Sequence, residues 1–447
     1  MKKRFVRILT AVAVVIVALG IIYAIAVAVS AAKLRRVYAE LEKAGRPMQS
    51  ADVIPPEIPD AENAALLYQS AALLLKAQPA PQKSEDQKDK DLLSYLGSLS
   101  ISLLDGAIEP NELAELERLI GQDAVSQALS IVQQGARRPG CRFEQNYNPL
   151  FAHNPSLLDL RGLTRLLDAK TRLEARAGRP ANAWELAWVQ LKLADALRQD
   201  PIIISQLVRM AMIRSSCDTI QAICRSAAPD KQQSQALSEL LLPLDDIRPV
   251  IHAIDGERLL MGEALFNTPK RQLWGELREY VSENPMPDFF YWFLFHRITF
   301  RPSFLADHAA YLRVMHDRCG VIARPYSPND AKEPELGGHM TNILVPAMYR
   351  IKEIYLEDMA RIRITLAGLA LLQYREAHGV FPPALDALGM KDLVDPFSDQ
   401  PLHYQAEGEG FLLYSVGKDQ KDNGGAAKQP KQKTDYDIVW RFPGGSK

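Results

Sequence analysis

The sequence predicts a mainly α-helical protein that starts with one transmembrane helix and ends in a small α+β unit. Three observations predict this fold class. Residues 8–32 are uninterrupted apolar sequence, residues 92–350 repeat apolar side chains at helical spacing, and residues beyond 400 alternate short apolar runs with Asp- and Gly-rich turns. We expect four parts: a cytoplasmic stub and anchor (1–36), a linker with one helix and a charged loop (37–91), an irregular all-α domain (92–350) and an α+β head (351–447).

The composition is that of a globular protein. Of 447 residues, 47% are hydrophobic and 24% are charged, which excludes a wholly disordered chain. The 53 Lys and Arg residues nearly balance the 54 Asp and Glu residues, so there is no basic field to drive nucleic-acid binding. We therefore expect no nucleic-acid partner.

Residues 8–32 predict a membrane anchor, with Ile8, Val15, Ile21 and Ile25 among its apolar side chains. Roughly 25 residues of helix measure about 37 Å, enough to cross a hydrocarbon core of about 30 Å. A cleavable signal peptide has a shorter apolar region of about 7–15 residues, although residues 28–32 (AVSAA) have the composition of a cleavage site. Basic residues flank both ends, so the charge distribution alone does not orient the helix.

The middle of the chain predicts helices throughout. The clearest pair is 155–177 and 181–198, separated by Gly178-Arg179-Pro180, because Gly favours a helix C-terminus and Pro a first helical turn. This hairpin is similar to a single tetratricopeptide-type unit, without a second copy at a fixed period. We expect further helices at 60–76, 202–227, 231–241, 244–266, 271–282, 304–318 and 344–378.

Three features of this region carry alternatives. The aromatic run 289–295 (FFYWFLF) is expected in the helical core; the alternatives are an interfacial membrane helix and a partner-binding patch. The four cysteines are expected as buried thiols, with a Cys141–Cys319 bridge left open. The run 255–258 (DGER) is interpreted as part of a solvated helix face.

The sequence contains no P-loop, His-Glu-x-x-His or Gly-x-Ser-x-Gly motif, and we expect no catalytic site.

The last part of the chain carries a recognisable pattern. A long helix ends at Gly379 and is followed by Phe381-Pro382, and then by the segments 394–398 (VDPFS), 402–404 (LHY), 411–419 (FLLYSVGKD) and 437–440 (DIVW). This pattern resembles the head of the major pseudopilin of type II secretion systems. The resemblance covers about 80 residues and implies a three-stranded antiparallel sheet that works outside the inner membrane. We therefore expect a single-pass inner-membrane protein with its bulk exported.

The resemblance also implies a calcium loop. Pseudopilin heads bind Ca²⁺ with aspartates from both arms of a loop and with backbone carbonyls. Asp419 and Asp437 match the family's aspartates, Asp435 matches more loosely, and Asp422 lies in an insertion; the carbonyl of Val416 completes the expected set. Two acidic clusters around a Gly-rich turn suit a cation that takes six to eight oxygens. The alternative is an ordinary solvated loop, since Asp, Asn and Gly are common turn residues.

The chain departs from that family in one important respect. The helix before the head is internal and lacks the apolar half and the prepilin cleavage sequence of a pseudopilin. We therefore expect a non-enzymatic scaffold or interaction module of the envelope or of a type II secretion-like process. The alternatives are an enzyme with a dispersed site between the helical domain and the head, and a minor component that docks into a pseudopilus.

Overall fold

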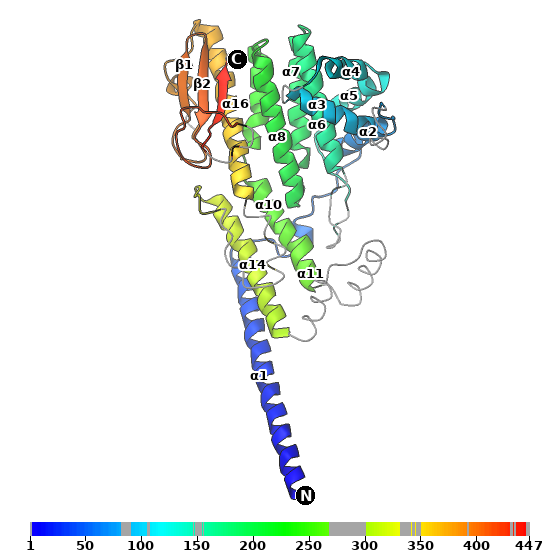
Figure 1. The fold of residues 1–447 in the computed structure, drawn as a ribbon, viewed down its shortest axis with the longest axis vertical. Helices are drawn as coiled ribbons and strands as arrows, with labels where there is room; N and C mark the ends of the chain where they lie inside the picture. The colour runs from blue at the N-terminus through cyan, green and yellow to red at the C-terminus, as the bar shows by residue number, and fades with distance from the viewer. Residues whose placement is uncertain are drawn as a thin grey trace.

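The structure, a computed structural model, consists mostly of helices, with a small sheet near the C-terminus (Figure 1). It describes residues 2–81, 91–104, 108–145, 147, 154, 156–267, 301–330, 341, 345, 350–390, 393–429, 432 and 435–443. The predicted helix 271–282, the aromatic run 289–295 and most of the charged loop 78–91 lie outside these residues.

The first helix, α1 (Lys2–Lys43), projects from the rest of the protein (Figure 1). Its apolar window has a mean hydropathy of 3.0, and no part of that window is buried. The side chains of Ile8, Val15, Ile21 and Ile25 are all more than half exposed. α1 is long and apolar enough to cross a membrane. A membrane anchor and a signal sequence both have such a helix near the N-terminus.

The remaining helices confirm most of the predicted segments. Their bounds are α2 Ala64–Lys76, α3 Leu92–Leu104, α4 Pro110–Ile120, α5 Asp123–Ala136, α6 Leu157–Arg176, α7 Pro180–Ala194, α8 Ile203–Cys224, α9 Lys231–Leu241, α10 Arg248–Gly256, α11 Ala264–Asn267, α14 Arg301–Ala323 and α16 Ile351–His378. Within the described residues, short 3₁₀ turns lie at Ser50–Asp52, Asp195–Leu197, Leu242–Leu244 and Leu385–Leu388.

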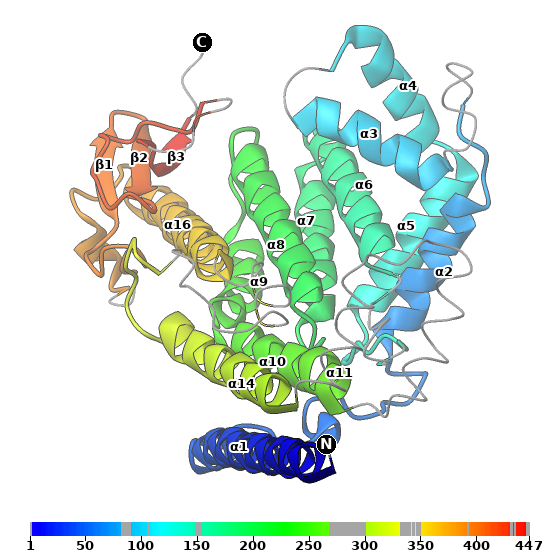
Figure 2. The ribbon, with the colours of Figure 1, turned by 60° about the horizontal axis from the view of Figure 1, so that its bottom comes forward.

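The predicted hairpin of α6 and α7 lies in the centre of the body. Gly178 adopts a φ of +71° between the two helices, which is the left-handed conformation that Gly provides at a helix end, and Pro180 begins α7. α8 packs against both helices and also against α16. Figure 2 shows these helices side by side, with α2 to α5 at one end of the row and the sheet at the other.

The predicted helix 244–266 is divided into three parts. α10 ends at Gly256, a π-helical segment runs over Glu257–Glu263, and α11 follows. Close contact with α14 accompanies this change, since a Cβ atom added to Gly262 would lie 2.0 Å from the Tyr311 hydroxyl oxygen. The segment is therefore helical, as predicted, with π-helical instead of α-helical hydrogen bonding over Glu257–Glu263.

The head contains the predicted three-stranded antiparallel sheet. Its strands are β1 (His403–Glu407), β2 (Gly410–Ser415) and β3 (Ile438–Phe442), in the order β1-β2-β3. Trp440 of β3 packs on α16 at Gly368, where an added Cβ would lie 1.8 Å from the indole ring. Only the absence of a side chain at Gly368 allows this close approach.

One apolar core continues through the whole body. It extends from Val37 and Leu41 of α1, through α2 to α8, to Trp440 in the head. The head is thus packed on the helical domain, as the lack of a flexible linker before α16 predicts. All four cysteines carry free thiols, so the open alternative of a Cys141–Cys319 bridge is wrong, and Cys217, Cys224 and Cys319 are buried as predicted.

Candidate functional site

Two groups of charged residues stand out from this fold. The first is the loop 416–437 between β2 and β3, called the Asp loop below, which contains every predicted calcium ligand. The second is a buried cluster where α1 joins the body, called the junction network below. It consists of Tyr38, Arg46, Asp255, Arg258, Glu263 and His308.

Asp395 fixes the start of the Asp loop. Its side chain is fully buried and accepts hydrogen bonds from the Val416 amide (2.8 Å), the Ser415 hydroxyl (2.8 Å) and the Phe397 amide (2.9 Å). The predicted ligand Val416 therefore lies where the chain leaves β2, held through its N–H group. The sequence pattern contains Asp395 in the segment VDPFS but gives no sign that it holds this turn.

Asp419 and Asp437 are brought together, as the resemblance implies. The side-chain amide of Asn423 donates to both carboxylates, at 3.3 Å to Asp419 and 3.4 Å to Asp437. Asp437 also accepts from the backbone amides of Asn423 and Gly425, at 3.3 Å and 2.7 Å. Its side chain is buried, and this burial raises the pKa of Asp437 despite those hydrogen bonds.

The carboxylates of Asp422 and Asp435 have other partners. Asp422 accepts hydrogen bonds from the Gly424 amide (2.8 Å), which most strongly lowers its pKa, and from the Tyr414 hydroxyl (2.9 Å). The carboxylate of Asp435 lies 3.9 Å from the Lys421 amine, while its own amide donates to Asp419. Two of the four predicted carboxylates thus share one position. Among the residues that the structure describes, no group of three His, Cys, Asp or Glu side chains is placed to hold a metal.

The junction network pairs opposite charges in the protein interior. Arg46 follows α1 and binds both oxygens of Asp255 in α10, one of them at 3.2 Å from Nε. Arg258 lies in the π-helical segment and contacts Glu263 and the Pro47 carbonyl. Residues five positions apart come close together in a π-helix, which pairs Arg258 with Glu263. Two guanidinium groups and two carboxylates therefore balance one another in this buried cluster.

α1 contributes a second contact to this network. The Tyr38 hydroxyl donates to Glu263 at 2.9 Å and lies 3.4 Å from Nε2 of His308 in α14. Burial raises the pKa of Glu263, and the Arg258 charge and the Tyr38 hydrogen bond oppose that shift. Arg46 also contacts the Cys319 thiol, whose pKa is raised to about 12 by burial. These contacts join the end of α1 to α10, the π-helical segment and α14.

The interpretation of residues 255–258 as a solvated face is wrong, because none of the four residues is exposed. Asp255 is 4% exposed and Arg258 is 1% exposed. Glu257 points away from the ion pairs and accepts a hydrogen bond from the Ile203 amide at 3.4 Å. Burial raises the pKa of Glu257 to about 7. No local sequence signal could have found the network, since Arg46 and Asp255 are 209 positions apart.

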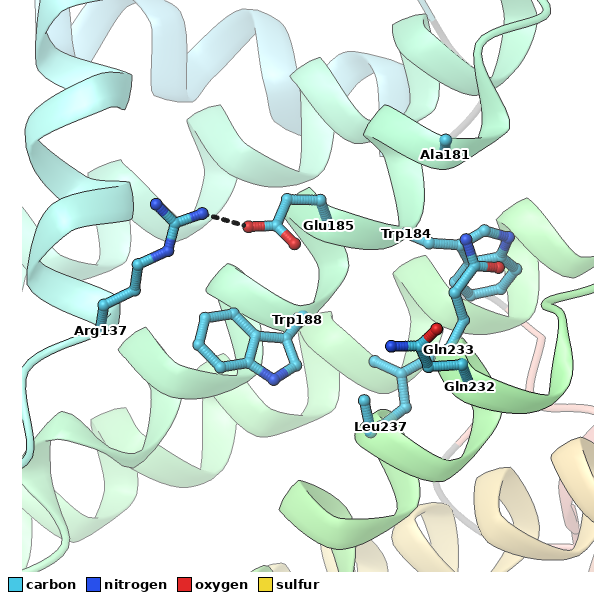
Figure 3. Close-up of a pocket in the computed structure, with 9 residues that line it drawn as sticks. Arg137, Ala181, Trp184, Glu185, Trp188, Gln232, Gln233 and Leu237 are labelled. Atoms are coloured by element: carbon cyan, nitrogen blue, oxygen red, sulfur yellow. Dashed lines mark hydrogen bonds and ion pairs between the residues drawn. The ribbon is translucent and has the colours of Figure 1, made fainter.

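A surface groove lies on the helical body between α5, α7 and α9 (Figure 3). Its volume is about 350 Å³. Trp188 of α7 provides partly exposed indole surface, Trp184 is only 3% exposed, and Gln232 and Gln233 of α9 provide amide groups. Arg137 pairs with Glu185 at 2.9 Å at one side of the groove. Such a surface can bind an apolar side chain together with neighbouring peptide groups.

Comparisons with known proteins do not place the chain in a family. No protein-family model matches the sequence, and no curated protein and no solved structure matches it.

Proposed function

We propose that this chain is a non-enzymatic scaffold or interaction module, anchored in the inner membrane by α1 with its body and head on the exported side. One observation carries the proposal. α1 continues without a break from an uncovered apolar segment into the junction network, where Tyr38 and Arg46 bind buried partners. Such a connection gives the body a fixed orientation relative to the membrane, which suits a protein that presents surfaces to partners.

The length of the uncovered part of α1 supports the anchor. Every residue of α1 from Phe5 to Ile25 is exposed, partial cover by the body begins at Ala26, and Val29 is still 50% exposed. Roughly 20 residues of helix measure about 30 Å, which equals the hydrocarbon thickness of a bilayer. The body therefore begins where the membrane would end.

Two features support interaction as the task of the exported part. The groove on α7 carries the partly exposed side chain of Trp188, and Trp is enriched at binding hot spots. The head has the sheet implied by the resemblance to pseudopilins, a family that works in type II secretion. We propose that partners are envelope or secretion proteins and that they contact these surfaces.

The placement is tested with a reporter enzyme, active only outside the cytoplasm, fused to the C-terminus. We expect an active reporter and a chain that stays in the membrane fraction during alkaline extraction. A reporter that is active only inside the cell would refute the proposed topology. Release of the chain by alkali would refute the anchor.

The interaction role is tested by affinity purification of the full chain from solubilised membranes. We expect envelope proteins to be recovered with the wild type and reduced with Trp188→Ala, because the substitution removes an indole from the groove. Lys231→Ala, on the first turn of α9, is the control and should leave recovery unchanged. Equal recovery with both variants would exclude the groove, and recovery of a secretion ATPase or prepilin peptidase would favour docking into a pseudopilus.

We further propose that the Asp loop binds Ca²⁺ through Asp419 and Asp437. Their convergence on the Asn423 amide supports this, because a cation in the same place would be held by both carboxylates. The head is then expected to melt a few degrees higher with Ca²⁺ than with a chelator. Asp419→Ala and Asp437→Ala should each abolish the difference. A calcium-dependent shift that persists in both variants would place the ion elsewhere.

A further inference from the structure

A second groove lies at the membrane end of the body, between α1, α11 and α14. It has a volume of about 770 Å³, within the range of about 300–1,000 Å³ that is usual for small-molecule sites. Tyr23, Ala24 and Val27 of α1 form one side. Phe266, Arg301 and Phe304 form the other. Figure 1 shows α14 beside the upper part of α1, with its first residues nearest the projecting end.

The position of this groove relative to the bilayer follows from α1. The continuously exposed part of α1 ends at Ile25, Val29 is still 50% exposed, and the groove wall extends along α1 from Tyr23 to Leu34. The groove therefore opens at the boundary between acyl chains and headgroups. Tyr23 is 45% exposed at this level, and Tyr is a residue that favours the membrane interface. Lipids that surround α1 would be in direct contact with the groove.

The residues that line the groove indicate which kind of lipid it would bind. Arg301 is exposed, and no hydrogen bond or ion pair joins it to another residue in the described part of the chain. Asn267 also lines the groove, and the rest of the wall beside α1 is largely apolar. A guanidinium group beside an apolar channel at headgroup level is complementary to a phosphate attached to acyl chains.

We propose that this groove binds one anionic phospholipid of the bilayer, with its phosphate at Arg301 and an acyl chain along Ala24, Val27 and Phe304. The inference rests on the proposed membrane anchoring. The bound lipid fills the space between the anchor and α14, just below the contact of Tyr38 with Glu263. It thereby links the membrane surface to the junction network.

The test uses the full chain purified in a mild detergent and examined by native mass spectrometry. Phosphatidylglycerol in phosphatidylcholine vesicles, compared with phosphatidylcholine alone, is the probe for affinity. We expect the wild type to retain one anionic phospholipid. Arg301→Gln should weaken its binding about tenfold, the factor expected from losing a charge-assisted hydrogen bond. Ala24→Trp should also reduce binding, because the ring occupies the apolar part of the groove.

Arg35→Gln is the matched control, since Arg35 is an exposed cation of α1 above the groove and outside its lining. It should keep the wild-type lipid affinity. Equal losses in Arg301→Gln and Arg35→Gln would mean general attraction to an anionic surface and would overturn the site. A wild type that resists alkaline extraction yet binds both vesicle types equally would also overturn it while leaving the anchor intact. Release by alkali would overturn the anchor and the groove together.

Discussion

The junction network and the Asp loop use charged residues in opposite ways. In the junction network, Arg46 pairs with Asp255, 209 positions away in the chain. Arg258 pairs locally with Asp255 and Glu263 and also donates to the carbonyl of Pro47, 211 positions away. In the Asp loop, Asp422 accepts a hydrogen bond from the Gly424 amide two positions away, and Asp437 accepts one from the Gly425 amide on the other arm of the same loop. The network therefore depends on tertiary structure, whereas the loop depends mainly on its own turns. The two regions should respond differently to mutation, pH and cations.

Removing one partner from the junction network should have the largest effect. Asp255→Ala leaves Arg46 and Arg258 in the interior without that carboxylate, and breaking a buried ion pair in this way costs about 3–5 kcal/mol. The free energy of unfolding is measured by denaturant titration of the full chain in detergent. Arg248→Ala is the control, since it removes an exposed partner of Asp246 and should cost at most about 1 kcal/mol. Similar costs for both variants would contradict the distinction.

Glu257 should make the free energy of unfolding of the protein depend on pH. Its pKa of about 7 in the folded protein lies above its ordinary value of 4.5 because of burial. The folded state therefore binds more protons than the unfolded state between these values. The free energy of unfolding should fall as the pH rises from about 4.5 to about 7, by at most roughly 3 kcal/mol.

Glu257→Gln isolates this contribution from those of other carboxyl groups. The difference between wild type and variant, measured by denaturant titration near pH 5 and near pH 8, should move in favour of the variant at the higher pH. Burial also raises the pKa of Asp358, to about 6, so part of the pH dependence should remain in the variant. A pH dependence that is identical in the two proteins would exclude Glu257 as its source.

The contact between Gly368 and Trp440 should give an intermediate effect. In Gly368→Ala the new methyl group meets the indole ring, and overpacking of this kind costs about 1–3 kcal/mol. Gly320→Ala is the matched control, because Gly320 also lies inside a helix and an added Cβ has no neighbour within 4 Å. It should stabilise the protein by up to about 1 kcal/mol. Thermal melting of both variants checks these opposite signs, and a neutral Gly368→Ala would refute close packing of the head on α16.

Local patterns in the sequence predict much of this fold. The apolar stretch of α1, the Gly-x-Pro break between α6 and α7, and the end of α16 at Gly379 all depend on residues within a few positions of one another. The three strands are also predicted, since short apolar runs between turns are a local signal. The Asp loop is predicted for the same reason, because its Asp and Gly residues are also a local signal in the sequence.

The junction network could not be predicted in this way. Asp255 and Arg258 have the spacing of an exposed helical ion pair, and the packing of α8 and α14 on this part of the chain, together with Arg46, makes them buried. The π-helical segment changes which side chains share a face, and the sequence gives no signal for it. Asp395 is part of a recognised segment, yet its hydrogen bond to Val416 requires the folded head.

The smallest effect is expected from the Asp loop without Ca²⁺. Asp419 accepts hydrogen bonds from the Lys421 and Asp435 amides, at 3.2 Å and 3.0 Å, in a partly exposed turn. Asp419→Ala measured with a chelator should therefore cost about 0.5–1.5 kcal/mol. Asp386→Ala, an exposed acid of the head outside the loop, should change the stability by less than about 0.5 kcal/mol. If Asp419→Ala instead costs as much as Asp255→Ala, the loop is a cooperative part of the tertiary structure, and the contrast between the two regions fails.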